Sequence, residues 1–141
     1  MGKSKTMKEV TVNAVVQNLD IVTDFVNEQL EMLDCPVKKQ MQIDVVLDEI
    51  FGNICHYAYT QSEGEVTVRM EEKENGAAVE LTFIDSGVRY NPLEKEDPDT
   101  TLSIEEKPIG GLGIFIVKKT MDELSYRYEK GQNILTVKKY L

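Results

Sequence analysis

Residues 65–85 constrain the fold most, because they contain two segments of alternating polarity separated by a short turn. The segments EVTVRMEEK and AAVELTFID have the period of strands with one buried face. The intervening Asn-Gly pair is typical of a hairpin turn. A second hairpin is predicted over residues 125–141, with its turn near Gly131, and residues 8–16 alternate well enough for a further strand. The chain must therefore build a sheet whose apolar face is covered by other elements.

Three segments have the helical period and can provide that cover. The first spans residues 19–33, and Asn18 or Asp20 can cap its start. The second begins with a proline and runs over residues 36–59, and the third covers residues 110–124. This order predicts an α+β protein. It should be a two-layer sandwich with a mixed, mostly antiparallel sheet and the helices on one of its faces.

Length and charge restrict the class of protein. The 141 residues suit one domain, expected over residues 8–141 after a tail of residues 1–7. Sixteen basic against 25 acidic residues give a net charge of −9, which repels nucleic acid. No run approaches the ~20 apolar residues of a membrane span, and no signal-peptide core is present, so we expect no membrane association and a cytoplasmic protein. Cys35 and Cys55 have neither the spacing of a zinc site nor that of a disulfide framework.

Glu49 and Asn53 lie one helical turn apart, at the edge of the apolar stripe of the second predicted helix. A carboxylate at the rim of an apolar cleft can accept a proton from a nucleophile. A carboxamide oxygen one turn away can ligate Mg²⁺, which favours oxygen ligands. Polar residues at this spacing are also common on ordinary amphipathic helices. The spacing alone leaves both interpretations open.

Asp85 and Gly87 follow the second alternating strand as an Asp-Ser-Gly sequence. A carboxylate at the end of a strand can accept a hydrogen bond from an exocyclic amine, and a glycine two residues later lets a flat ring approach the backbone. The same three residue types are favoured in simple turns. This motif is therefore a binding site or a turn.

Gly110, Gly111 and Gly113 open the third predicted helix. Glycines at a helix N-terminus expose backbone N–H groups to an anion such as phosphate. No Gly-Lys-Ser/Thr follows, so the segment is not a Walker A loop, and it follows a loop where a dinucleotide-binding motif would follow a strand. The three motifs, in this order and within one small domain, suggest an ATP pocket.

With these motifs in place, the chain resembles the GHKL ATPase superfamily, and within it the anti-sigma-factor serine/threonine kinases. The resemblance runs from about residue 8 to the C-terminus and implies a Bergerat-type ATP-binding fold. It implies ATP and Mg²⁺ as cofactors. It also implies that residues 93–109 form a lid over the nucleotide.

The resemblance also implies roles for individual residues. Glu49 matches the general base and Asn53 the asparagine that holds Mg²⁺ between the phosphates. Asp85 matches the aspartate that binds the adenine amino group, and Gly87 the glycine beside the ring. The remaining matches are Gly111 and Gly113 at the phosphate end, with Gly110 adjoining them, and Thr136 near the adenine.

One position departs from the family pattern. Many relatives have a histidine or lysine four residues after the magnesium asparagine, whereas this chain has Tyr57 there and its single histidine, His56, one residue earlier. We expect His56 to be partly buried and satisfied by local hydrogen bonds, and not to contact phosphate. The shift leaves catalytic efficiency open but does not affect the expectation of nucleotide binding.

The resemblance favours one function and leaves others open. It implies a kinase that phosphorylates a small anti-sigma-factor antagonist, binds a sigma factor and forms a homodimer. The alternative is a nucleotide-dependent switch that chooses a protein partner without transferring phosphate. A signalling domain whose pocket no longer binds nucleotide is the third interpretation.

Overall fold

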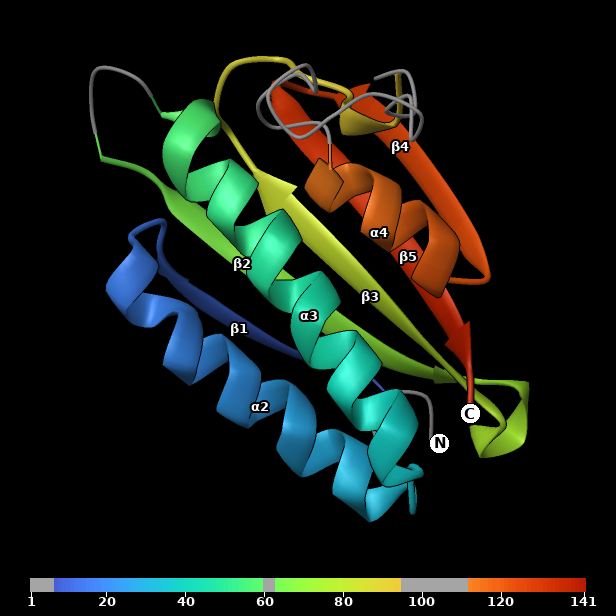
Figure 1. Ribbon diagram of the computed structural model, residues 1–141. Helices are drawn as coiled ribbons and strands as arrows, with labels where there is room; N and C mark the ends of the chain where they lie inside the picture. Colours follow the sequence, from blue (N-terminus) through green and yellow to red (C-terminus); the bar gives the residue numbers. More distant parts are fainter. Residues whose placement is uncertain (1–6, 60–62, 95–111) are drawn as a thin grey trace.

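The computed structural model describes residues 7–59, 63–94 and 112–141. It has two layers, a five-stranded sheet and three α-helices that all lie on the same face of the sheet (Figure 1). This arrangement confirms the predicted α+β sandwich.

The sheet is antiparallel in every pair of neighbouring described strands, so the expected mixed sheet is wrong. The strands are β1 (Met7–Asn13), β2 (Glu65–Lys73), β3 (Ala78–Asp85), β4 (Glu123–Glu129) and β5 (Gln132–Tyr140). Their spatial order is β1-β2-β3-β5-β4. Strands β3 and β4 run in the same direction, but β5 lies between them and pairs antiparallel with both. Because β5 lies between them, β3 and β4 do not pair with each other in parallel.

The helices are α2 (Leu19–Met32), α3 (Val37–Asn53) and α4 (Leu112–Thr120). A π-helical turn, η2 (Ile54–Ala58), continues α3, so the predicted extent of the second helix is confirmed to within one residue. Among the helices that the structure describes, none is long and apolar enough to cross a membrane. Short 3₁₀ turns complete the described chain: η1 (Val16–Asn18), η3 (Glu74–Gly76) and η4 (Pro92–Glu94).

One helix end and one helix cap differ from the prediction. Helix α4 stops at Thr120, where residues up to 124 were expected, because Leu124 already belongs to β4. Lys139 of β5 donates a hydrogen bond from Nζ to the Thr120 carbonyl oxygen, at 2.6 Å, and so caps the C-terminus of α4. At the start of α2, the Asn18 side chain makes no capping hydrogen bond, since its Nδ2 donates to the Asn13 carbonyl oxygen at 2.9 Å.

The core lies between the two layers. Helix α3 contributes most to it, because it lies across the middle of the sheet with α2 on one side and α4 on the other (Figure 1). Burial of these apolar side chains is the main stabilising contribution, about 1.5–3 kcal/mol for each fully buried large side chain. The largest fully buried side chains include Phe51, Phe83, Leu30, Ile43, Leu47, Ile50 and Leu81. With α3 fixed in this way, its C-terminal end lies beside the end of β3.

Candidate functional site

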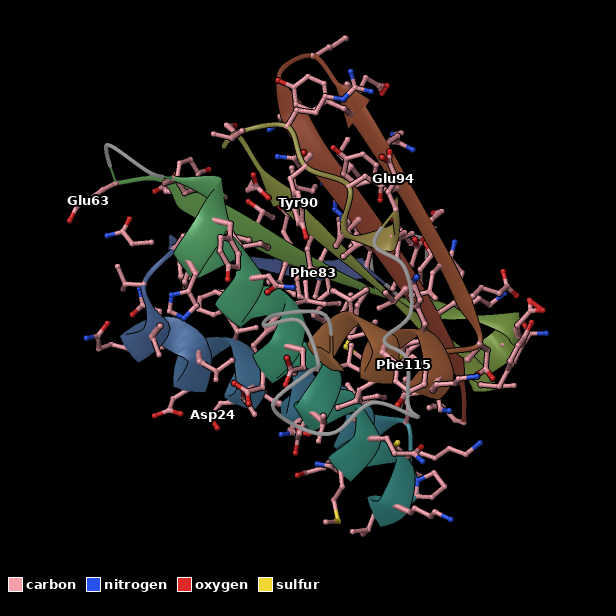
Figure 2. The ribbon with its side chains drawn as sticks, turned by 45° about the horizontal axis from the view of Figure 1, so that its top comes forward. Asp24, Glu63, Phe83, Tyr90, Glu94 and Phe115 are labelled. Carbon is pink, nitrogen blue, oxygen red and sulfur yellow. The ribbon has the colours of Figure 1, made fainter. Side chains whose placement is uncertain are left out.

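A cleft of about 460 Å³, part of it open to solvent, lies between the C-terminal end of α3, the turn η2 and the ends of β3 and β5. Its lining is mostly apolar and includes Phe83 and Tyr90, both labelled in Figure 2. The lining also includes three polar side chains, those of Asn53, Asp85 and Asn133. A cleft with apolar walls and a few convergent polar groups is the usual form of a small-molecule site.

Asn53 and Asp85 come from different elements and meet in this cleft. Asn53 is the last residue of α3, and Asp85 is the last residue of β3. The structure thus brings together two of the residues that the sequence singled out. Residues lining one cleft are in position to contact one ligand.

Glu49 lies on α3 one turn before Asn53 and next to the first turn of α4. An ideal Cβ on Gly113 would come within 2.8 Å of the Glu49 carboxyl carbon, so the two helices approach each other closely here. Gly110 and Gly111 fall outside the described residues, and so does nearly all of the expected lid, residues 93–109. Gly113 is the described glycine of the motif, and it lies beside the Glu49 carboxylate in the N-terminal turn of α4.

Asp85 is 6% exposed, and its hydrogen bonds involve one carboxylate oxygen. Oδ1 accepts from the Gly87 backbone N–H at 2.9 Å and from Asn133 Nδ2 at 2.9 Å. Burial raises the pKa of the Asp85 carboxyl group above its ordinary value, and the hydrogen bonds from Asn133 and Gly87 oppose that rise. Within the described residues, no hydrogen bond reaches Oδ2. Asp85 thus offers one acceptor atom to a ligand donor.

Gly87 is in close contact with the turn η2. An ideal Cβ at this position would lie 2.6 Å from the carbonyl carbon of Ala58 and equally close to its Cβ. The next residue, Val88, donates its backbone N–H to the Ala58 carbonyl oxygen at 2.8 Å. Glycine is required here because the backbone that follows β3 packs directly against η2, which lines the cleft.

The structure does not bring Thr136 to the cleft. Its hydroxyl oxygen lies 3.4 Å from that of Thr82 on the neighbouring strand β3. Leu135 and Val137, on either side of it, belong to the core under the helices. Side chains alternate along a strand, so Thr136 lies on the sheet face opposite the helices.

Asn133 is the site residue that sequence reasoning missed. It lies three positions before Thr136 on β5, hence on the opposite face, where it lines the cleft and contacts Asp85. The alternation of β5 carried only part of the signal: Asn133 shares its parity with the core residues Leu135 and Val137, but Ile134 on the other face is apolar too.

The turn η2 places His56 and Tyr57 at the surface. His56 is exposed, and no hydrogen bond of its side chain occurs within the described residues, so the expected partly buried histidine is wrong. Tyr57 is 52% exposed and lines the cleft. The i→i+5 hydrogen bonding of a π-helical turn rotates these two side chains relative to a regular helix, and such turns are frequent at functional sites.

Tyr59, just after η2, fixes this corner of the cleft. Its hydroxyl donates to the Glu65 carbonyl oxygen at 2.6 Å and accepts the Ser86 backbone N–H at 2.8 Å. One side chain therefore ties the end of the helical segment to the start of β2 and to the residue after Asp85.

The fold is consistent with the Bergerat ATPase fold, and comparison with known families gives the class of the domain. Residues 12–139 match the family described as histidine kinase-like ATPase domain, and the chain belongs to that family. Membership implies ATP binding. Similar proteins include the serine-protein kinases RsbW of Bacillus cereus, Bacillus anthracis and Bacillus mycoides. Each is 28% identical over 98 residues, 67% of this chain and 60% of the relative, so the match spans less than two thirds of those proteins.

Proposed function

We propose that this chain is an ATP-dependent serine/threonine protein kinase that acts in a partner-switching pathway. The observation that carries the proposal is the meeting of Asp85 and Asn53 in one cleft, with Glu49 beside the start of α4. The likeness to serine-protein kinases supports the same class of reaction.

The cleft suits the adenine ring of the nucleotide. Its apolar lining would cover the adenine ring, and Asp85 Oδ2 would accept a hydrogen bond from the adenine amino group. The triphosphate would extend toward Asn53 and the N-terminal turn of α4, because backbone N–H groups at a helix N-terminus favour anions.

Magnesium fits the chemistry of the available donors. Within the described residues, no group of three or more histidine, cysteine or acidic side chains could hold a metal ion. Mg²⁺ often keeps several waters and takes phosphate oxygens with one or two protein oxygens. Asn53 would supply such an oxygen, and the ion would offset phosphate charge during transfer. We therefore expect Mg²⁺ to bind with ATP and not to the free protein.

Glu49 would act as the general base. A serine or threonine hydroxyl of the substrate protein would attack the γ-phosphorus, and the bond from that phosphorus to the bridging oxygen of ADP would break. Glu49 would take the proton that the hydroxyl loses. The products are the phosphoprotein and ADP.

The proposed partners follow from the family resemblance. The substrate would be a small anti-sigma-factor antagonist, the second partner a sigma factor, and the kinase itself a homodimer. The acidic surface, with a net charge of −9, makes a direct nucleic-acid partner unfavourable.

The assignment of Glu49 as the general base is tested with radiolabelled Mg-ATP and a candidate antagonist protein from the same cell. Glu49→Gln should lower phosphate transfer by about 10²–10⁴-fold, the usual contribution of a general base. Asp48→Asn is the matched control, because Asp48 is an exposed carboxylate next in sequence to Glu49. Equal transfer rates for wild type and Glu49→Gln would overturn the assignment of the base.

A nucleotide-dependent switch without phosphate transfer is the second candidate. It is favoured by Tyr57, which places an uncharged side chain at the cleft where many relatives have a cation. Retention of the antagonist on immobilised protein only with Mg-ATP, and without label on the antagonist, would identify the switch. Label on the antagonist would identify the kinase.

A further inference from the structure

Asn133 uses all of its hydrogen-bonding capacity in the wall of the cleft. The residue is 6% exposed. Oδ1 accepts from the Tyr90 backbone N–H at 3.0 Å and from the Tyr126 hydroxyl. Nδ2 donates to Asp85 Oδ1 at 2.9 Å and to the Val88 carbonyl oxygen at 2.9 Å. A carboxamide has two donor hydrogens and two acceptor positions, and all four are occupied here.

Two backbone groups fix the direction of this amide. The Tyr90 N–H can only donate, and the Val88 carbonyl oxygen can only accept. Rotating the Asn133 amide by half a turn would set N–H against N–H and oxygen against oxygen, leaving buried polar groups unpaired. The Nδ2 group of Asn133 must therefore face Asp85.

This fixed direction determines what Asp85 can offer to a ligand. Asp85 Oδ1 receives one N–H from Asn133 and one from Gly87, so it is saturated with donors and has no room for a proton of its own. These two hydrogen bonds favour the ionised carboxylate and oppose the effect of burial on the pKa of Asp85. In this ionised form the remaining oxygen, Oδ2, is an acceptor.

An acceptor at this position discriminates between purine rings. A 6-amino group donates a hydrogen bond to Oδ2, whereas a 6-oxo group would place a second acceptor against it. We propose that Asn133 is a specificity-determining positioning residue, which makes the cleft select 6-amino over 6-oxo purine nucleotides by holding Asp85 as an acceptor. This inference rests on the proposed binding of ATP in the cleft. It assigns to Asn133 the strand position near the adenine that the sequence suggested for Thr136.

The test compares binding of Mg-ATP and Mg-ITP, which differ at position 6 of the purine, by titration calorimetry between pH 6 and pH 8. Wild type should prefer ATP by at least about tenfold, the cost of one unpaired buried polar group. Asn133→Asp replaces the donor by an acceptor, so the two carboxyl groups need a shared proton to coexist. Its ATP affinity relative to wild type should be at least about tenfold lower at pH 8 and should recover toward pH 6.

Two further variants separate positioning from general loss of structure. A serine hydroxyl has a single donor hydrogen and cannot donate to Asp85 and Val88 together, so Asn133→Ser should lose several-fold of the ATP preference without gaining a pH dependence. Thr136→Val is the control, because its side chain lies on the sheet face opposite the cleft, and its preference should stay within about threefold of wild type.

Each result has a definite meaning. ATP binding by wild type together with an unchanged ATP-to-ITP ratio in Asn133→Asp and Asn133→Ser would overturn this inference and leave the proposed function intact. An ATP affinity of Asn133→Asp that does not change between pH 6 and pH 8 would also overturn it. Absence of any nucleotide binding by the wild-type protein would overturn both.

Discussion

Gly113, in the first turn of α4, lies against the carboxylate of Glu49 on α3, and a Cβ at position 113 would collide with that side chain. The close approach explains why a residue with high conformational freedom stands in a helix, where it costs about 0.5–1 kcal/mol relative to alanine. Without a Cβ at position 113, the Glu49 carboxylate can lie against the first turn of α4. A larger residue would have to move it away.

We predict that Gly113→Ala separates stability from activity. The free energy of unfolding should stay constant or rise by up to about 1 kcal/mol, because alanine favours the helix and the displaced atoms belong to a flexible side chain. Phosphate transfer should fall at least about tenfold, because Glu49 is moved from its position. Urea unfolding and the radiolabel assay measure the two effects. Gly52→Ala on α3 is the matched control, since a Cβ there meets no atom within 4 Å and transfer should stay at the wild-type rate.

Gly87→Ala should damage both properties together. The added Cβ would meet the backbone of Ala58, which cannot rotate away as a side chain can. We expect a loss of about 1–3 kcal/mol in the free energy of unfolding, as for other overpacked sites. Binding of Mg-ATP should weaken as well, because the Gly87 N–H holds Asp85. An unfolding midpoint equal to that of wild type would show that this contact can relax.

Thr136→Val should leave ATP affinity within about twofold of wild type, since a side chain on the far face of the sheet can affect the cleft only indirectly. The substitution keeps the β-branched shape and removes the hydroxyl that faces Thr82. Titration calorimetry provides the measurement. A tenfold loss of affinity would restore the role near the adenine that the sequence suggested for this residue.

Asp85→Asn should stabilise the protein at neutral pH while abolishing ATP selectivity. Burial raises the pKa of Asp85 in the folded state above the value of 3.8 for the free side chain. The folded state therefore binds more protons than the unfolded state between these two values, and wild-type stability falls as pH rises through this window. The amide of the Asp85→Asn variant does not titrate, so the variant does not lose stability as the pH rises through this window. Its amide oxygen can still accept hydrogen bonds from Gly87 and Asn133.

The stability advantage of Asp85→Asn should thus be largest above the folded-state pKa and should shrink as the pH approaches 4. Urea unfolding of both proteins between pH 4 and pH 8 measures this difference. An advantage that is constant across the range would show that the Asp85 carboxyl group does not titrate differently in the folded state. ATP affinity should fall at least about tenfold, because an amide N–H₂ would then face the adenine amino group.

Local patterns were sufficient for the architecture and for part of the site. The change from helical period to alternation predicted the two layers, because periodicity reports directly which side chains face the core. The spacing of Glu49 and Asn53 placed both on one edge of α3, since residues four apart on a helix are neighbours. The direction of the sheet pairs was not determined by these patterns, because it depends on β5 lying between β3 and β4.

The sequence by itself determined the elements, the helix that carries Glu49 and Asn53, and the strand end that carries Asp85. Only the tertiary structure decided that Asn133, and not Thr136, meets Asp85. The run of Ile134 and Leu135 makes both faces of β5 apolar, so alternation alone did not identify the inner face. The contact joins residues 48 positions apart, and it exists because β5 pairs with β3 in the register that sets Asn133 opposite Asp85.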